Sequence, residues 1–243
     1  MSFHEPTSDV SRLNRMAAHE AVTVDPATFA VLMKAQALAE ESNGVFDITV
    51  AADLVVWGFL PPPEFAPQPD HQASWRDIEL SGKTVRFRRP LWIDLGGIAK
   101  GYAVDCALAT MALPARVQVS INAGGDLRIA GPASETVRLR APSDGRHVPV
   151  LEIEDASLAS SSGRDDVRLV DGNPVGPHVN GATHVSIGMD SFVSVAAKDC
   201  MTADALTKIV LARGAAAAGL LARHNATAYF NDGKTWQTFG AMN

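Results

Sequence analysis

The chain has 243 residues, of which 47% are hydrophobic, and its 21 Lys and Arg against 27 Asp and Glu give a net charge of −6. A chain of this length buries enough surface for a core, which excludes disulfide scaffolds and disordered proteins. The acidic balance, with no basic run longer than Arg88-Arg89, argues against a nucleic-acid partner or an anionic membrane surface. No stretch approaches the roughly 18 to 20 apolar residues that span a bilayer, so we expect no transmembrane segment.

Two cysteines, Cys106 and Cys200, lie in apolar, helix-like contexts, which favours buried and unreactive thiols. The N-terminus lacks the charged and apolar regions of a secretory signal. As the chain stands, we therefore expect a cytoplasmic protein.

The first half of the chain shows clear start and stop signals. A helix is predicted to begin after Asp25, which can cap it, and to end at residues 43–44. Prolines between residues 61 and 69 predict an extended loop, and residues 78–87 predict a hairpin that turns at residues 81–82.

The remaining elements follow from apolar patterns between glycine-rich turns. Residues 91–95 predict a short strand, which leads through Gly96-Gly97 into a helix over 98–111. Long helices and strands are segregated along the chain, which predicts a single α+β domain over 1–243 with a mixed, largely antiparallel sheet core and flanking helices. Further strands are predicted over 116–121, 127–130, 137–141, 148–153, 191–196 and from 227, and helices over 202–212 and 215–223.

The glycine pair Gly96-Gly97 would free backbone amides at a helix N-terminus, which suits a phosphate. Lys100, about one turn into the helix, would add a positive charge, and Asp94 would accept from a hydroxyl or an amide. The segment is neither a Walker A loop nor a dinucleotide fingerprint. From these residues alone, a packing turn and an anion site remain alternatives.

Two other segments carry similar signals. The sequence 122–126, Asn-Ala-Gly-Gly-Asp, suits a ligand site or a plain hairpin turn. On the later helix, which we expect Thr202 to cap, Asp204 and Thr207 are three residues apart and share one face. A carboxylate and a hydroxyl on one face suit a hard divalent cation, whereas Asp204 alone would also complement the helix dipole.

Taken together, these segments resemble the ApbE-like FAD:protein FMN transferases. The blocks at 94–101, Asp-Leu-Gly-Gly-Ile-Ala-Lys-Gly, and at 122–126 are the most specific parts of the resemblance. Other similar segments, in the order of the family, are 8–15, 43–50, 57–59 and 201–211.

The resemblance implies an enzyme that binds FAD, uses Mg²⁺ on the pyrophosphate, and moves FMN onto a Thr or Ser hydroxyl of an acceptor protein with release of AMP. Such a reaction needs positioning and charge neutralisation above all. The resemblance assigns catalysis to Lys100, His178 and Asp204, and the metal to Gly97, Asp204 and Thr207. It assigns FAD binding to Phe46, Asp47, Asp94, Lys100, Asn122, Gly124, Gly125, Asp126 and His178.

This sequence departs from the family pattern on the Asp204 helix. Many members place the metal-binding Thr four residues after the Asp, but here that position is Lys208 and Thr207 stands three after. Either Thr207 takes the ligand role, or the Lys208 ammonium pairs with Asp204 and replaces part of the charge of the cation, with weaker metal binding.

A second departure follows Ser162-Gly163. The family motif His-x-x-Asp-Pro-x-x-Gly is represented by His178, without its Asp and Pro. His178 either assists proton transfer from the attacking hydroxyl or is a surface-loop histidine.

The front of the chain is shorter than the family pattern. The usual first strand and helix are expected to be absent here, and an export segment upstream would place the protein in the periplasm or at the inner membrane. The alternatives to the transferase are an FAD pyrophosphatase, which uses water in place of the acceptor, and a catalytically impaired FAD-binding protein. A homodimer is among the expected states.

Overall fold

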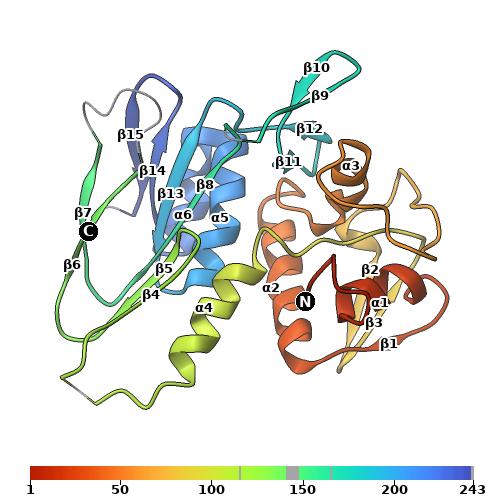
Figure 1. The fold of residues 1–243 in the computed structure, drawn as a ribbon, viewed down its shortest axis with the longest axis horizontal. Coiled ribbons are helices and arrows are strands. Elements are labelled where there is room, and N and C mark those ends of the chain that lie inside the picture. Colours follow the sequence, from red (N-terminus) through yellow and green to blue (C-terminus); the bar gives the residue numbers. More distant parts are fainter. Residues whose placement is uncertain (115, 141–147, 165, 242–243) are drawn as a thin grey trace. The chain divides into compact units, whose positions relative to one another are not determined.

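The computed structural model describes residues 1–114, 116–140, 148–164 and 166–241. They divide into two compact units: unit 1 comprises Met1–Ala99 and Asp166–Ile187, and unit 2 comprises Lys100–Asp165 and Gly188–Asn243. Helices combine with antiparallel strands in these units, which confirms the α+β class (Figure 1). The single domain over 1–243 stays a prediction.

Unit 1 contains most of the helices of the first half of the chain. The Asp25 carboxylate accepts from the Ala27 N–H at 2.8 Å, as expected for a helix N-cap. Asn43 and Gly44 follow the last turn with positive φ, which ends the helix close to the predicted position. The helices of the unit are α1 (Asp9–Met16), α2 (Pro26–Glu41), η1 (Ile48–Val50), α3 (Ala51–Val56) and η2 (Trp75–Asp77).

The strands of unit 1 are short. The predicted hairpin over 78–87 is confirmed, and its second strand pairs with the first strand of the chain to give the order β1-β3-β2. Two small hairpins, β9 with β10 and β11 with β12, complete the unit. The bounds are β1 (Val22–Thr23), β2 (Ile78–Ser81), β3 (Thr84–Phe87), β9 (Arg168–Val170), β10 (Asn173–Val175), β11 (Val179–Asn180) and β12 (Val185–Ser186).

Residues 91–95 form no strand, so this prediction is wrong. Ile93 is held by the side-chain amide of Asn14, whose Oδ1 accepts from its N–H at 2.8 Å and whose Nδ2 donates to its carbonyl at 3.1 Å. The Asp94 N–H bonds the Ile48 carbonyl at 2.9 Å. Hydrogen bonds with the Asn14 side chain of α1 and with the Ile48 carbonyl of η1 thus satisfy backbone groups that the apolar pattern assigned to a sheet.

Unit 2 is built on one antiparallel sheet of six strands in the order β15-β14-β13-β8-β5-β4 (Figure 1). The two outer strands β6 and β7 pair with each other and form a separate hairpin. The bounds are β4 (Val119–Ala123), β5 (Asp126–Ala130), β6 (Glu135–Arg138), β7 (Val150–Ile153), β8 (Ser157–Ser162), β13 (Phe192–Ala197), β14 (Thr227–Asn231) and β15 (Trp236–Gly240).

The predicted strands of unit 2 are present, with ends that differ by up to three residues. Residue 141, the predicted end of one strand, lies outside the described residues. The central strand β8 and the last strand β15 were not predicted. The helices of the unit are α4 (Ala99–Ala109), α5 (Cys200–Arg213), η3 (Gly214–Ala217) and α6 (Ala218–Arg223).

The two faces of the large sheet pack against different elements. Leu127 of β5 pairs with Leu158 of β8, and both belong to an apolar cluster with residues of β7. The residues directly before and after Leu127 and Leu158 point to the opposite face of the sheet, because side chains alternate along a strand. That face packs against α5, where Ser161 of β8 bonds Thr207. Asp126, which precedes Leu127, therefore points to the helix side of the sheet.

Helix α5 begins at Cys200, one residue after its N-cap. The N-cap is Asp199, whose carboxylate accepts from the Thr202 N–H at 2.8 Å, so the prediction that Thr202 caps this helix is wrong. Within the described part of the chain, the run Cys200–Arg223 is long and apolar enough to cross a membrane by length and composition alone. Half of the most apolar part of that run is buried, the run breaks at Gly214, and it carries the buried Asp204, which are features of a core helix.

Helices α4 and α5 approach each other closely at Gly101. A Cβ at this position would lie 2.2 Å from the carbonyl oxygen of Cys200 and 2.6 Å from its carbonyl carbon. Backbone atoms cannot move away as a flexible side chain can, so only glycine permits this helix crossing. The close approach also lets the Gly101 N–H reach the Asp204 carboxylate at 3.3 Å.

We predict that Gly101→Ala lowers the free energy of unfolding by about 1–3 kcal/mol, because the added methyl group forces α4 away from α5. Urea denaturation followed by circular dichroism measures the change. The matched control is Gly219→Ala in α6, where a Cβ would meet no atom within 4 Å. Helix propensity alone should leave that variant as stable or up to about 1 kcal/mol more stable. Equal stability of Gly101→Ala and wild type would contradict the steric account.

Candidate active site

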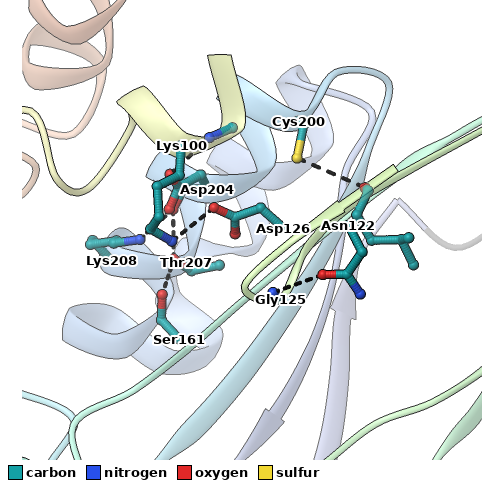
Figure 2. Close-up of polar contacts among 11 residues, drawn as sticks. Lys100, Asn122, Gly125, Asp126, Ser161, Cys200, Asp204, Thr207 and Lys208 are labelled. Carbon is teal, nitrogen blue, oxygen red and sulfur yellow. Dashed lines mark hydrogen bonds and ion pairs between the residues drawn. The ribbon is translucent and has the colours of Figure 1, made fainter. Parts of the chain in front are cut away.

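The predicted site residues fall into both units. Of those of unit 2, Lys100, Asp126, Asp204 and Thr207 form one cluster on α4, α5 and β5, which Figure 2 shows in close-up. Asn122, Gly124 and Gly125 belong to the hairpin turn that precedes Asp126. In unit 1, Phe46 and Asp47 lie after α2, Asp94 and Gly97 lie shortly before α4, and His178 lies directly before β11. Unit 2 carries Lys100, Asn122, Gly124, Gly125, Asp126, Asp204 and Thr207, and unit 1 carries Phe46, Asp47, Asp94, Gly97 and His178.

Asp204 is the fully buried carboxylate at the centre of the unit 2 cluster (Figure 2). Its Oδ2 accepts from the Gly101 N–H, and its Oδ1 accepts from the Lys208 ammonium one turn further along α5. Lys208 Nζ also donates to the Asp204 carbonyl at 3.1 Å. The structure thus contains the Lys208 to Asp204 contact that one of the two alternatives for this helix requires.

Thr207 shares the buried face of Asp204, as predicted from their spacing. Its hydroxyl donates to the Asp204 carbonyl at 2.6 Å and lies 2.7 Å from the Ser161 hydroxyl of β8. A hydroxyl has one proton, so Ser161 is the donor in the second bond. Thr207 thereby ties α5 to the central strand of the sheet, and its proton is already in use.

Asp126 brings the second buried carboxylate from the sheet. The hairpin before it turns through Gly124 and Gly125, both with positive φ, and the Gly125 N–H bonds Asn122 Oδ1 at 3.0 Å. The Asn-Ala-Gly-Gly-Asp block is thus a tight hairpin turn, which delivers Asp126 to the helix side. Asp126 Oδ2 accepts from Lys100 Nζ at 2.8 Å, whereas its buried Oδ1 has no hydrogen-bond partner among the described residues.

The charges of this cluster influence one another. Burial, followed by the negative charge of Asp204, raises the pKa of Asp126, while Lys100 and Lys208 lower it by a smaller amount. Burial alone would lower the pKa of Lys100, but the nearby Asp204 and Asp126 carboxylates raise it overall.

The two cysteines differ in exposure. Burial raises the pKa of the Cys200 thiol, which fits the predicted unreactive thiol, and Cys106 is half-buried.

Asp105 and Ser161 are members of the cluster that the sequence patterns did not indicate. Asp105 of α4 accepts from the Cys200 N–H at 2.8 Å and from the Met201 N–H at 2.9 Å, which holds the start of α5. Burial raises the pKa of Asp105, against the effect of these two donors. A carboxylate that caps a helix 95 residues away leaves no local signal in the sequence.

In unit 1, the Asp47 carboxylate accepts hydrogen bonds from other residues of the same unit. Oδ1 accepts from the Thr49 N–H and hydroxyl, both at 2.8 Å, and Oδ2 accepts from the Trp75 N–H at 3.2 Å. Burial raises the pKa of Asp47 despite these bonds. Phe46 is buried beside it, and a Cβ on Gly181 would lie 2.4 Å from the Asp47 Cβ. The assigned FAD contacts of Phe46 and Asp47 stay predictions.

Asp94, Gly97 and His178 are also placed in unit 1. Asp94 Oδ2 accepts from the Gly96 N–H at 3.0 Å, so the first glycine block is a tight turn before α4. His178 is half-buried, and its carbonyl accepts from the Ile187 N–H at 2.9 Å beside the β11–β12 hairpin. Whether these residues bind a phosphate or move a proton stays a prediction.

The donor set of unit 2 does not fit the Mg²⁺ that the resemblance implies. Mg²⁺ requires oxygen ligands in a near-octahedral arrangement, but the Lys208 ammonium already occupies Asp204 Oδ1. The Thr207 hydroxyl donates to the Asp204 carbonyl and accepts from Ser161, and Asp126 Oδ1 is one of the buried polar atoms without a partner among the described residues. Nor do residues 1–114, 116–140, 148–164 and 166–241 contain a cluster of three or more acidic, His or Cys side chains suited to a metal.

Comparison with known proteins identifies the family. The ApbE family model matches residues 1–230, so the chain belongs to the ApbE family. The FAD:protein FMN transferase of Vibrio cholerae serotype O1 is 29% identical over 241 residues, which cover 88% of this chain and 69% of that protein.

Two solved structures show the shared fold. The apo form of the flavinyl transferase ApbE of Pseudomonas stutzeri superposes with a TM-score of 0.82 at 20% identity, over 99% of this chain and 81% of that chain. The ApbE protein of Thermotoga maritima gives 0.80 at 25% identity, over 97% and 82%. The expected absence of the first strand and helix of the family stays a prediction.

We predict that Lys100→Met destabilises the protein at pH 7 by about 1–3 kcal/mol, because it leaves the buried Asp126 carboxylate without its cation. The loss is below the 3–5 kcal/mol of a fully buried pair, since the Lys100 side chain is 51% exposed. Adding Asp126→Asn, which removes the uncompensated charge, should restore part of the stability. Urea denaturation of the three proteins measures these effects.

The same variant has a defined pH dependence. The folded-state pKa of Asp126 is above its unfolded value and should rise further without Lys100, so ionised Asp126 destabilises the fold above that pKa. The deficit of Lys100→Met relative to wild type should therefore shrink as the pH falls from 7 toward about 4, where the unfolded Asp titrates. A deficit that is independent of pH would contradict this cause.

Proposed function

We propose that this protein is an FAD:protein FMN transferase. In this reaction a hydroxyl oxygen of an acceptor protein forms a bond to the phosphorus of the FMN half of FAD. The bond from that phosphorus to the oxygen of the AMP half breaks, AMP leaves with the electron pair, and the hydroxyl proton passes to a base. Thr or Ser as the acceptor residue is part of this proposal.

One observation carries the proposal: the buried charge cluster of unit 2 lies on the segments that give the family similarity. The Lys100 ammonium is anchored to buried Asp126 and half-exposed, so it is positioned to contact an anionic ligand. Its raised pKa keeps it charged. A fixed positive charge next to a pyrophosphate stabilises the charge that develops on the leaving AMP.

The other assigned residues receive roles within this proposal. Asp204 holds the Lys208 ammonium and the Gly101 amide in place. His178 would accept the proton of the attacking hydroxyl. Phe46, Asp47 and Asp94 would contact FAD, with Asn122, Gly124 and Gly125 at the hairpin turn. A homodimer rests on the family resemblance alone, and the magnesium that the resemblance implies does not fit the donors of unit 2.

The test uses FAD and an acceptor protein that carries one Thr flavinylation site, with the Thr→Ala form of that acceptor as a blank. Intact mass spectrometry should find one FMN, less water, on the Thr acceptor only, and chromatography should find an equal amount of AMP. Free FMN with AMP would identify a pyrophosphatase. FAD binding without AMP would identify an impaired binding protein.

We predict that Asp204→Asn slows FMN transfer by about 100-fold or more, because the neutral amide no longer fixes the charge of Lys208. The rate of AMP release and of acceptor labelling measures the loss. The matched control is Asp155→Asn in the same unit, where the carboxylate is 68% exposed and pairs with Arg128. That variant should keep its rate within about twofold. Unchanged transfer by Asp204→Asn would exclude the assigned role.

A further inference from the structure

We propose that the Lys208 ammonium is a built-in cation at Asp204, which takes the place of a divalent metal in the unit 2 cluster. The reaction itself rests on the proposed function, but the metal-binding behaviour does not. The inference starts from the mismatch between the donors of this cluster and Mg²⁺.

The contact of Lys208 with Asp204 is part-buried and has the favoured helical geometry. The acid precedes the base by four residues, the orientation that brings their side chains together on a helix. Asp204 is fully buried, and only 13% of the Lys208 side chain is exposed. A buried carboxylate needs a paired charge, and Lys208 supplies it from the same helix.

The Asp126 and Asp204 carboxylates are balanced without any added ion, whereas Asp105 accepts from two backbone N–H groups at the start of α5. Asp126 and Asp204 contribute two negative charges, and Lys100 and Lys208 contribute two positive ones, each in a direct ion pair. A divalent ion at Asp204 would have to displace an ammonium that is bound by two acceptors of that residue. It would also face repulsion from the cations that remain.

Lys208 retains a capacity to contact an anionic ligand. An ammonium has three N–H donors, and the Asp204 Oδ1 and carbonyl oxygens accept two of them. The third donor is left for an oxygen of a pyrophosphate. Lys208 would thus deliver to the substrate the point charge that a metal ion delivers elsewhere, with Thr207 fixing the helix turn through Ser161.

The first experiment is a Mn²⁺ titration of the metal-free full-length protein, without FAD, followed by electron paramagnetic resonance. The variant Lys208→Thr places a hydroxyl where the ammonium was, and Asp204→Asn removes the carboxylate. Wild type should bind Mn²⁺ at least 10-fold more weakly than Lys208→Thr, and Lys208→Thr with Asp204→Asn should lose the gain. Circular dichroism confirms that each variant is folded.

The second experiment measures AMP release from FAD in EDTA and in Mg²⁺. Wild type should keep its rate in EDTA within about twofold, whereas Lys208→Thr should require Mg²⁺. Tight one-to-one Mn²⁺ binding by wild type that Asp204→Asn abolishes, no gain of binding in Lys208→Thr, or a wild-type rate that is lost in EDTA would each overturn the proposal. If no protein releases AMP under any condition, the proposed function fails, and the Mn²⁺ titration still decides the role of Lys208.

Discussion

The structure of unit 2 depends on the burial of the Asp204 carboxylate beneath the sheet. An ionised group at such a depth is stable only where hydrogen bonds and an opposite charge replace water. The Gly101 amide and the Lys208 ammonium meet this need. The absence of a side chain at Gly101 permits the close contact between α4 and α5, and Asp105 of α4 accepts from the first N–H group of α5. Both contacts hold together the two helices that surround the Asp204 carboxylate.

The sheet supplies the complementary half of the cluster through strand alternation. Leu127 belongs to the apolar face and its neighbour Asp126 to the helix face, so one hairpin builds both a core and a charged site. The glycine turn before Asp126 sets this register. The glycine block at residues 122–126 is thus a structural turn in this protein, and it places the Asp126 carboxylate where Lys100 of α4 pairs with it.

Part of this arrangement was predictable from the sequence and part was not. Local signals predicted α2, the β2–β3 hairpin and the shared face of Asp204 and Thr207, because caps, turns and helical spacing act over a few residues. The strand β8 was not predicted, since its sequence Ser-Leu-Ala-Ser-Ser-Ser has Leu158 as its one bulky apolar residue and shows no apolar alternation; its small side chains face α5. The pairing of Asn14 with Ile93 and of Asp105 with α5 joins distant segments and has no local signature.

Lys208 stands where many family members have the metal-binding Thr, and its ammonium pairs with Asp204 in this chain. A tethered ammonium is always present and cannot be removed by chelation, whereas a bound ion depends on its concentration. The most direct measurement is a crystal structure of the protein soaked with Mn²⁺ and FAD, with an anomalous difference map. We expect Lys208 Nζ on Asp204 and no Mn²⁺ peak at that carboxylate. A Mn²⁺ ion bound to Asp204, with Lys208 displaced, would contradict the central claim.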